Sequence, residues 1–257
     1  MSSRTSLVDG RHAEILDFLS GNGRVKVSEL AERFGVSPLT MRRDLDFLGS
    51  KRLVRRTHGY AELVDPLGSP ISSTAILAKR SIAEYAAGLI EDGDTVFINT
   101  SSTALLAIEH ITAQNVTVVT NNGRALQLSS PASVSIILTG GEIRQPKWSM
   151  SGEFALASIN RVNAAKAILG CSGLSAKRGL TTLVSHETSI NSLMLEHSDR
   201  RIIVADGTKI GVNSSFRYGN PEQVDVLVTD GSADADEMAR LEAAGVREAR
   251  YACGEGV

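Results

Sequence analysis

The sequence has few cysteines and no long apolar run. Its 257 residues include only Cys171 and Cys253, which have neither paired nor metal-ligand spacing. Reduced thiols are therefore expected rather than a disulfide framework. No apolar stretch approaches the roughly 20 residues that a membrane span needs, and the first residues lack the apolar core of a signal peptide. The sequence predicts a soluble, cytoplasmic protein with no membrane partner.

Metal motifs, internal repeats and low-complexity tracts are missing as well. The five histidines show no close pairing such as His-x-x-x-His, so we expect no metal and no cofactor. A hydrophobic content of 42% and a charged content of 22% predict a folded chain with a real core. The length suits a small module joined to a larger one.

The net charge of −2 is unevenly distributed. Up to Leu63 the chain has eleven basic and eight acidic residues, a net charge of +3, so the remainder carries −5. This asymmetry favours a basic module attached to an acidic one. A charge of +3 alone says little about the binding partner, and the residue pattern has to decide it.

A short helix is predicted from Pro38, with Ser37 as its cap. The Ser37 hydroxyl can accept from the free amides of the first turn, and Pro38 suits the first helical position because its missing N–H costs nothing there. Met41, Leu45 and Leu48 recur at i, i+4 and i+7 and form one apolar stripe. The helix is therefore expected to bury this stripe and to expose the rest of its first turns.

Thr40, Arg42 and Arg43 lie largely off that stripe, near the start of the helix. Hydroxyl and guanidinium groups can bind phosphates and base edges in the major groove of DNA. The alternative is a solvated face whose arginines pair with Asp44 or Asp46, and two adjacent arginines alone would favour it. The capped helix, with a turn and helix before it and a basic wing after it, favours DNA contact.

The flanking segments have the order of a winged helix-turn-helix. Helices are predicted over residues 11–19 and over 29–34, the second capped by Ser28, and Gly35 supplies the positive φ of a tight turn. A two-stranded wing is predicted over residues 51–63. Its His58 could contact a phosphate or simply hold the wing turn. The residues expected to contact DNA are Ser37, Pro38, Thr40, Arg42, Arg43, Arg55, Arg56 and His58.

These segments resemble the DNA-binding domain of the DeoR family of bacterial repressors. The matching segments are Glu29-Leu30-Ala31 through Val36-Ser37, Thr40-Met41-Arg42-Arg43-Asp44-Leu45, and His58-Gly59-Tyr60-Ala61. The family's wing usually ends His-Gly-Gly-Ala, so Tyr60 departs from the pattern. The resemblance implies that the module, residues 1–64, binds double-stranded operator DNA.

A linker is predicted over residues 65–78, because Asp65 to Pro70 has the composition of one. Beyond it, short β-branched runs alternate with amphipathic stretches, which indicates an α/β domain with a mostly parallel sheet. The runs begin at Thr95, Val116, Val134, Ala167, Arg201 and Val224. We therefore expect residues 79–257 to form a second domain.

Small polar residues follow these predicted strands. Ligands of an open parallel sheet bind beyond the carboxyl ends of its strands, and here Asn99 to Thr103 precedes a predicted helix, as in an anion-binding loop. One such loop alone would be an ordinary capped turn, but several on one edge favour a ligand site. Lys209 could supply a point charge to a phosphate.

This second part resembles the effector-sensing domain of the DeoR family, which is related in fold to ribose-5-phosphate isomerase and binds sugar phosphates. The best-matching segments are Lys79 with Ile82-Ala83, Val119-Thr120-Asn121, Gly140-Gly141 with Gly152, Gly179-Leu180-Thr181-Thr182 with Glu187, and Asp206 with Lys209-Ile210-Gly211. The family's first loop usually reads Asp-x-Gly-Thr-Thr, whereas Asn99 and Ser101 stand here for the carboxylate and the glycine. The residues expected to bind the effector are Lys79, Asn99, Thr100, Ser101, Ser102, Thr103, Asn121, Gly140, Gly141, Glu187, Asp206 and Lys209.

Structural roles remain the alternative for several of these residues. Lys79 could simply begin its helix, Lys209 could be merely exposed, and Asp206 and Glu187 could be hydrogen-bond partners within the fold. Cys171 is expected to be a small buried residue.

Together these features predict a transcriptional regulator, a repressor of a carbohydrate catabolic operon that is modulated by a phosphorylated sugar or a related small anion. It is expected to bind DNA as a homo-oligomer, a dimer or a tetramer. Two alternatives stay open: the second domain could be a sugar-phosphate isomerase or transferase with Asp206 or Glu187 as acid or base, and the wing could bind protein instead of DNA.

Overall fold

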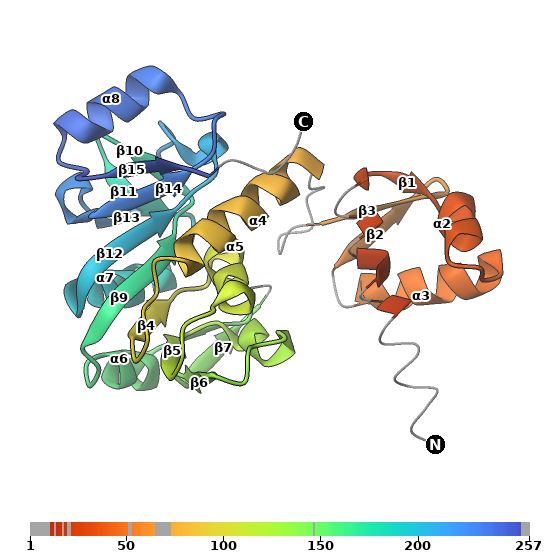
Figure 1. The fold of residues 1–257 in the computed structure, drawn as a ribbon, viewed down its shortest axis with the longest axis horizontal. Coiled ribbons are helices and arrows are strands. Elements are labelled where there is room, and N and C mark those ends of the chain that lie inside the picture. Colours follow the sequence, from red (N-terminus) through yellow and green to blue (C-terminus); the bar gives the residue numbers. More distant parts are fainter. Residues whose placement is uncertain are drawn as a thin grey trace. The chain divides into compact units, whose positions relative to one another are not determined.

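The computed structural model of this chain describes residues 11–64 and 73–252, apart from residues 13, 17, 20, 21, 51, 52 and 146. The chain divides into two compact units, Met1–Leu77 and Ala78–Val257, each with its own core (Figure 1). Most of the predicted linker and Cys253 lie outside the described residues. No helix in the described ranges has the length and apolar character needed to cross a membrane.

The N-terminal unit combines helices with a small antiparallel sheet (Figure 1). Residues 11–19 are helical wherever they are described. Helix α2 spans Val27–Arg33 and helix α3 spans Pro38–Ser50. The sheet has the strand order β1 (Val25–Lys26), β3 (Tyr60–Leu63), β2 (Val54–Thr57).

The apolar stripe of α3 forms part of this core, as its spacing predicts. Met41, Leu45 and Leu48 are at most 2% exposed and belong to one cluster with Ile15 and Leu30. Burying a side chain of this size stabilises a fold by about 1.5–3 kcal/mol. The stripe therefore fixes which face of α3 stays outside.

The prediction that Ser28 caps α2 is wrong. The helix already begins at Val27, and the residue at the cap position, Lys26, makes no side-chain capping bond. The amide of Val27 donates instead to the carbonyl of Gly59 in the wing at 2.9 Å. Because the wing satisfies this amide, the helix can start one residue before the serine.

The C-terminal unit contains a seven-stranded sheet in which every pairing is parallel. Its order is β15 (Ala249–Tyr251), β14 (Val226–Thr229), β12 (Ser198–Val204), β9 (Ala164–Gly170), β4 (Thr95–Ile98), β5 (Val116–Thr120), β6 (Val134–Leu138). The six predicted strands are all present, and only the short β15 was not predicted. The chain runs outward from β4 in one direction and from β9 in the other, so the strand order reverses between these two strands.

Helices cover both faces of the sheet (Figure 1). Helices α4 (Ser73–Ala87) and α5 (Ser102–Leu106) pack on the face that contains Val96 and Ile98. Helices α6 (Glu153–Ile159), α7 (Thr188–Glu196) and α8 (Ala235–Ala243) pack on the opposite face. The sheet is thus buried on both sides, as parallel sheets usually are.

Helix α4 overlaps the end of the predicted linker. It begins at Ser73, inside the stretch 65–78. No proline or glycine lies between Pro70 and Ala87, and alanine and leucine are strong helix formers, so the helix can extend towards the N-terminus beyond Lys79.

Two small antiparallel elements, which the sequence did not predict, lie outside the main sheet. One is the hairpin of β7 (Glu142–Arg144) and β8 (Ser149–Ser151). The other has the order β10 (Gly173–Ser175), β11 (Gly179–Thr182), β13 (Phe216–Gly219). Both contribute residues to the candidate effector site.

Candidate nucleic-acid interface and effector site

The start of α3 is capped as predicted. The Ser37 hydroxyl accepts from the amide of Thr40 at 3.1 Å and shares a second hydrogen bond of 2.8 Å with the Thr40 hydroxyl. Thr40 therefore has a structural role in the free protein. Arg42 and Arg43 follow on the helix with exposed side chains.

Neither acid of α3 neutralises these two arginines. Asp44 is buried and accepts from Arg11 at 2.8 Å and 3.1 Å and from His12 at 3.1 Å. Asp46 pairs instead with Arg56 of the wing at 3.0 Å. Within the described residues, the side chains of Arg42 and Arg43 make no hydrogen bond or ion pair, so the alternative of a helix face that pairs its own arginines is wrong.

The arginines of the wing are paired, in contrast to those of α3. Arg55 donates to Glu62 across the wing at 2.9 Å. Arg56, besides its bond to Asp46, donates to the backbone carbonyl of Arg42 at 3.4 Å. These contacts partly neutralise the two wing arginines, but each guanidinium keeps N–H donors that the contacts do not use.

The wing turn consists of His58 and Gly59, with φ angles of +50° and +82°. Positive φ at both residues is typical of the two-residue turn that best fits a twisted hairpin. Tyr60 lies beyond this turn in β3, and the Arg24 guanidinium is 4.7 Å from its ring centre. The departure from the family's wing sequence therefore leaves the turn intact, with His58 at its first position.

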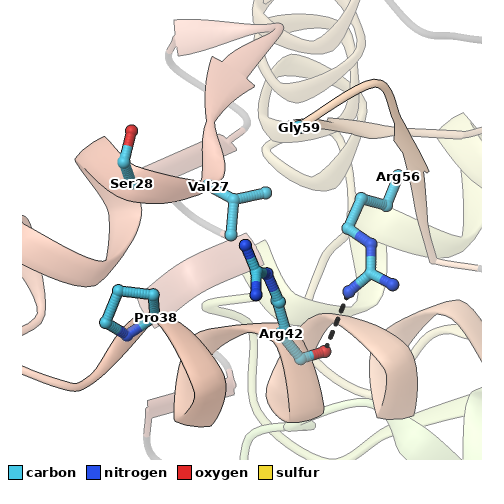
Figure 2. Close-up of a pocket in the computed structure, with 6 residues that line it drawn as sticks. All are labelled: Val27, Ser28, Pro38, Arg42, Arg56 and Gly59. Atoms are coloured by element: carbon cyan, nitrogen blue, oxygen red, sulfur yellow. Dashed lines mark hydrogen bonds between the residues drawn. The ribbon is translucent and has the colours of Figure 1, made fainter.

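A hollow of about 360 Å³ lies between the starts of α2 and α3 and the wing (Figure 2). Figure 2 shows the side chain of Arg42 directed from α3 towards Val27, and that of Arg56 directed from the wing to the α3 backbone. Two guanidinium groups thus line one concave surface. The lining residues are Val27, Ser28, Pro38, Arg42, Arg56 and Gly59.

The contacts of Asp44 predict an acid-sensitive N-terminal unit. Burial alone would raise the pKa of Asp44, but hydrogen bonds from Arg11 and His12 outweigh it and lower the pKa below its usual value of 3.8. A carboxyl whose pKa is lower in the folded state contributes stability above its unfolded pKa and loses that contribution as the pH falls through the folded pKa. The unit is therefore expected to lose stability below about pH 4.

Urea unfolding followed by circular dichroism between pH 3 and pH 7 measures this effect. Asp44→Asn is expected to be less stable than the wild type at neutral pH and to lose this part of the acid dependence. Asp46→Asn, which changes an exposed carboxylate on the same helix, is the matched control and should keep it. An Asp44→Asn variant with the wild-type pH profile would contradict the assignment.

The carboxyl ends of β4 and β9 are joined by Asn99. Its amide donates to the carbonyl of Gly170 at 2.9 Å, and its oxygen accepts from the Gly170 amide at 3.0 Å. The same side chain also donates to Asn191 and accepts from the Ser101 amide, both at 3.2 Å. Every donor and acceptor of this buried group is used within the fold, and contact of Asn99 with the effector stays a prediction.

This arrangement also explains why an amide stands where the family usually has a carboxylate. A carboxylate could accept from the Gly170 amide but could not donate to its carbonyl. Asn99 does both. It closes the sheet edge at the point where the strand order reverses, which is where ligands of such sheets bind.

Three other residues of the loop after β4 differ in their exposure and contacts. Ser101 caps α5 by accepting from the amide of Ala104 at 3.3 Å, and Thr103 is buried. Ser102 is exposed. Among these, Ser102 is therefore the residue best placed to meet a ligand.

Thr100 and Glu187 come together at the same edge. The Thr100 hydroxyl donates to one Glu187 oxygen at 2.7 Å, and the Thr182 hydroxyl donates to the other at 2.9 Å. The ammonium nitrogen of Lys147 lies 3.1 Å and 3.2 Å from the two Glu187 oxygens. Lys147 and Thr182 were not among the predicted site residues. Lys147 lies in the loop of a hairpin that was not predicted, so its position in the sequence does not indicate a site.

Asn121 follows β5 and is almost completely buried. Its amide donates to the carbonyl of Met150 at 3.2 Å, while its side-chain oxygen has no partner among the described residues. Gly140 and Gly141 follow β6 with φ angles of +73° and +104°. A side chain at Gly141 would lie 2.4 Å from the carbonyl oxygen of Ser151, so this glycine allows the β8 backbone to approach closely.

Asp206 and Lys209 follow β12. The Asp206 carboxylate accepts from the amide and the hydroxyl of Thr208, which makes it a cap of the short turn Gly207–Lys209. Burial raises the pKa of the Cys171 thiol to about 12 although nearby Lys209 opposes the rise, so this thiol stays protonated at neutral pH. Lys209 is half-buried beside it.

Lys79 belongs to α4, which packs on the sheet through Ile82 and Ala83. Its side chain is half-buried. In the part of the chain that the structure describes, no group of three or more histidine, cysteine, aspartate or glutamate side chains could hold a metal ion.

Two family descriptions match the chain. The DeoR-like helix-turn-helix domain matches residues 11–66, and the DeoR C terminal sensor domain matches residues 74–231. The glycerol-3-phosphate regulon repressor of Escherichia coli (strain K12) is 34% identical to this chain in sequence. The alignment covers 89% of this chain and 93% of the repressor. The transcriptional repressor GlcR of Bacillus subtilis (strain 168) is 30% identical to this chain, over 86% of this chain and 87% of GlcR.

Comparison with solved structures gives ribose 5-phosphate isomerase A from Neisseria gonorrhoeae, with 17% sequence identity, 56% of each chain covered and a TM-score of 0.38. The two family matches and the relatives cover both units. This chain belongs to the DeoR family of transcriptional regulators, with an N-terminal helix-turn-helix domain and a C-terminal sensor domain.

Proposed function

We propose that this chain is a transcriptional repressor that binds operator DNA through α3 and the wing, and that a phosphorylated sugar or a related small anion releases it. The observation that carries the proposal is the exposed pair Arg42 and Arg43, which have no partner among the described residues while the acids of the same helix are engaged elsewhere. The similarity to two repressors, that of the glycerol-3-phosphate regulon and GlcR, supports it.

In this proposal the start of α3 enters the major groove. Arg42 and Arg43 bind base edges or phosphates, and Ser37, Pro38 and Thr40 approach the backbone. Arg55, Arg56 and His58 of the wing lie along the adjacent phosphates. Arg56 exchanges Asp46 for a phosphate on binding, and this exchange costs little because the ion pair is exposed.

The effector site is proposed at the carboxyl edge of the sheet around β4 and β9. Ser102 and Lys209 offer a hydroxyl and a charge that remain accessible, and Thr100, Asn121, Gly140, Gly141, Glu187 and Asp206 form its surroundings. A phosphate monoester fits this set better than a neutral sugar, because a lysine and hydroxyl donors favour an anion.

Regulation follows if the repressor is a symmetric oligomer. Helix-turn-helix proteins usually bind two half-sites about one helical turn apart. An effector that binds more tightly to a state with a different spacing of the two recognition helices would weaken operator binding. By linkage, the operator must weaken effector binding by the same factor.

Substitutions at Ser102 and Lys209 test the effector half of the proposal. Ser102→Ala and Lys209→Gln are expected to retain operator affinity but to need at least about tenfold more phosphate monoester for release, because each loses a charged hydrogen bond. Gel-shift titration with a duplex selected by the wild type, in the presence of glycerol, pentose and hexose phosphates, measures both quantities. A normal response in both variants would show that the effector binds elsewhere.

An isomerase or transferase remains the second candidate, and its test is direct. Turnover needs a carboxylate free to move protons at the sugar carbons, whereas the two Glu187 oxygens already accept from Thr100 and Thr182. Incubation of the full chain with pentose and hexose phosphates should give no product. Product formation that Glu187→Gln or Asp206→Asn abolishes would contradict a purely regulatory role.

A further inference from the structure

The β7–β8 hairpin carries Lys147 to the carboxyl edge of the main sheet. The hairpin is fixed to the end of β5 by backbone hydrogen bonds, from Met150 to the carbonyl of Asn121 at 2.7 Å and from Gly123 to the carbonyl of Trp148 at 2.9 Å. Ser149 also shares a hydrogen bond of 3.2 Å with His186. The position of Lys147 is therefore set by neighbours that belong to the candidate effector site.

The backbone beside Lys147 is strained. Trp148 has a φ of +60°, a conformation that bulky side chains rarely adopt. Such residues persist only where the surrounding structure holds them, and they cluster at ligand clamps and switch regions. The hydrogen bond from Gly123 holds this one.

The ammonium of Lys147 and the carboxylate of Glu187 differ in their access to solvent. The Lys147 side chain is 22% exposed, whereas that of Glu187 is 3% exposed. Both Glu187 oxygens also accept from threonine hydroxyls, Thr100 on one side and Thr182 on the other. The carboxylate would thus keep two hydroxyl donors if the ammonium turned away, and the ammonium can reach an incoming anion.

We propose that Lys147 binds the phosphate group of the effector and that Glu187 holds its ammonium while the site is empty. This inference rests on the effector site proposed above. An ammonium forms charge-assisted hydrogen bonds with a phosphate as readily as with a carboxylate, so Lys147 can exchange one for the other while the two hydroxyls stay on Glu187. Glu187 therefore competes with the ligand for Lys147, which sets the effector concentration to which the repressor responds.

Charge-changing variants of the pair test this competition. The probes are inorganic phosphate and the phosphate monoesters of glycerol, ribose and glucose, titrated calorimetrically into the full chain at low ionic strength. Lys147→Gln is expected to weaken the best of these at least about tenfold, and Glu187→Gln to strengthen it, because the ammonium is then unpaired. Lys147→Arg should stay close to the wild type.

Lys177→Gln is the matched control, because it removes an exposed lysine from the turn between β10 and β11. It should bind all four probes as the wild type does. Lys147→Gln leaves the buried Glu187 charge uncompensated, so the double variant Lys147→Gln, Glu187→Gln is measured as well. It should fold like the wild type and bind as weakly as the single lysine variant.

The outcomes separate this inference from the proposed function. Wild-type affinity in Lys147→Gln or in the double variant overturns the role of Lys147 and leaves the effector site standing. A wild type that binds none of the four probes overturns both. Weakened phosphate binding together with unchanged operator affinity supports the role of Lys147 as a binding residue.

Discussion

Arg43→Ala is expected to abolish specific operator binding by the full chain while its fold and effector binding stay as in the wild type. The side chain is exposed and makes no hydrogen bond or ion pair among the described residues, so its removal costs the fold nothing. A well-formed arginine contact to a base is worth about 1–3 kcal/mol, or roughly 5- to 150-fold in affinity. A symmetric dimer loses this contact at both half-sites, a combined loss of roughly 25- to 20,000-fold, which brings specific binding close to the non-specific level.

Gel-shift titration between 50 mM and 200 mM salt measures both parts of this loss. The wild type should weaken steeply with salt, because each neutralised phosphate releases counterions. If Arg43 contacts a phosphate as well as a base, the salt dependence of the variant should be shallower by about one contact. Arg178→Ala, which removes an exposed arginine from the sensor domain, is the control and should bind like the wild type. Unchanged affinity in Arg43→Ala would remove α3 from its proposed role.

Gly141→Ala is expected to destabilise the sensor domain by more than about 3 kcal/mol, because it combines backbone strain with a clash. Its φ is +104°, and a Cβ there would lie 2.4 Å from the carbonyl oxygen of Ser151. That oxygen is backbone and cannot rotate away. The clash would displace β8 and with it the loop that carries Lys147.

Gly140→Ala is the matched control for this prediction. Its φ is +73°, but a Cβ there would meet nothing within 4 Å. Only the left-handed conformation is penalised, at roughly 1–2 kcal/mol. Thermal unfolding should therefore show a decrease in Tm of about 6–12 °C or more for Gly141→Ala and about 2–8 °C for Gly140→Ala, at 2–4 °C per kcal/mol for a unit of this size. Equal decreases would contradict the close approach of β8.

The N-terminal unit could be predicted largely because its signals are local. The Ser37 cap, the stripe of Met41 and Leu45, and the wing turn each depend on residues within a few positions of one another. The partners of Asp44 could not be predicted, because Arg11 and His12 precede it by more than 30 residues. Asp46 pairs with Arg56 of the wing, so neither acid of α3 pairs with Arg42 or Arg43 as the alternative required.

In the sensor domain the general fold could be predicted, but the contacts within the site could not. The alternation of strands and helices predicts the sheet, and the carboxyl ends of parallel strands must share an edge, so the general place of the site follows. The contacts within it do not follow, since Asn99 is separated from Gly170 by 71 residues and Lys147 from Glu187 by 40. The sequence therefore indicates that Asn99 lies at this edge, but not that it also joins two strands.

The proposed regulation depends on coupling between the DNA-binding surface of one unit and the effector site of the other. The most direct test titrates the selected operator with the full chain in the absence and in the presence of saturating phosphate monoester, and then titrates the monoester with and without operator. Both affinities are expected to fall by one common factor, on the order of 5- to 150-fold. A monoester that binds without any change in operator affinity would contradict this coupling.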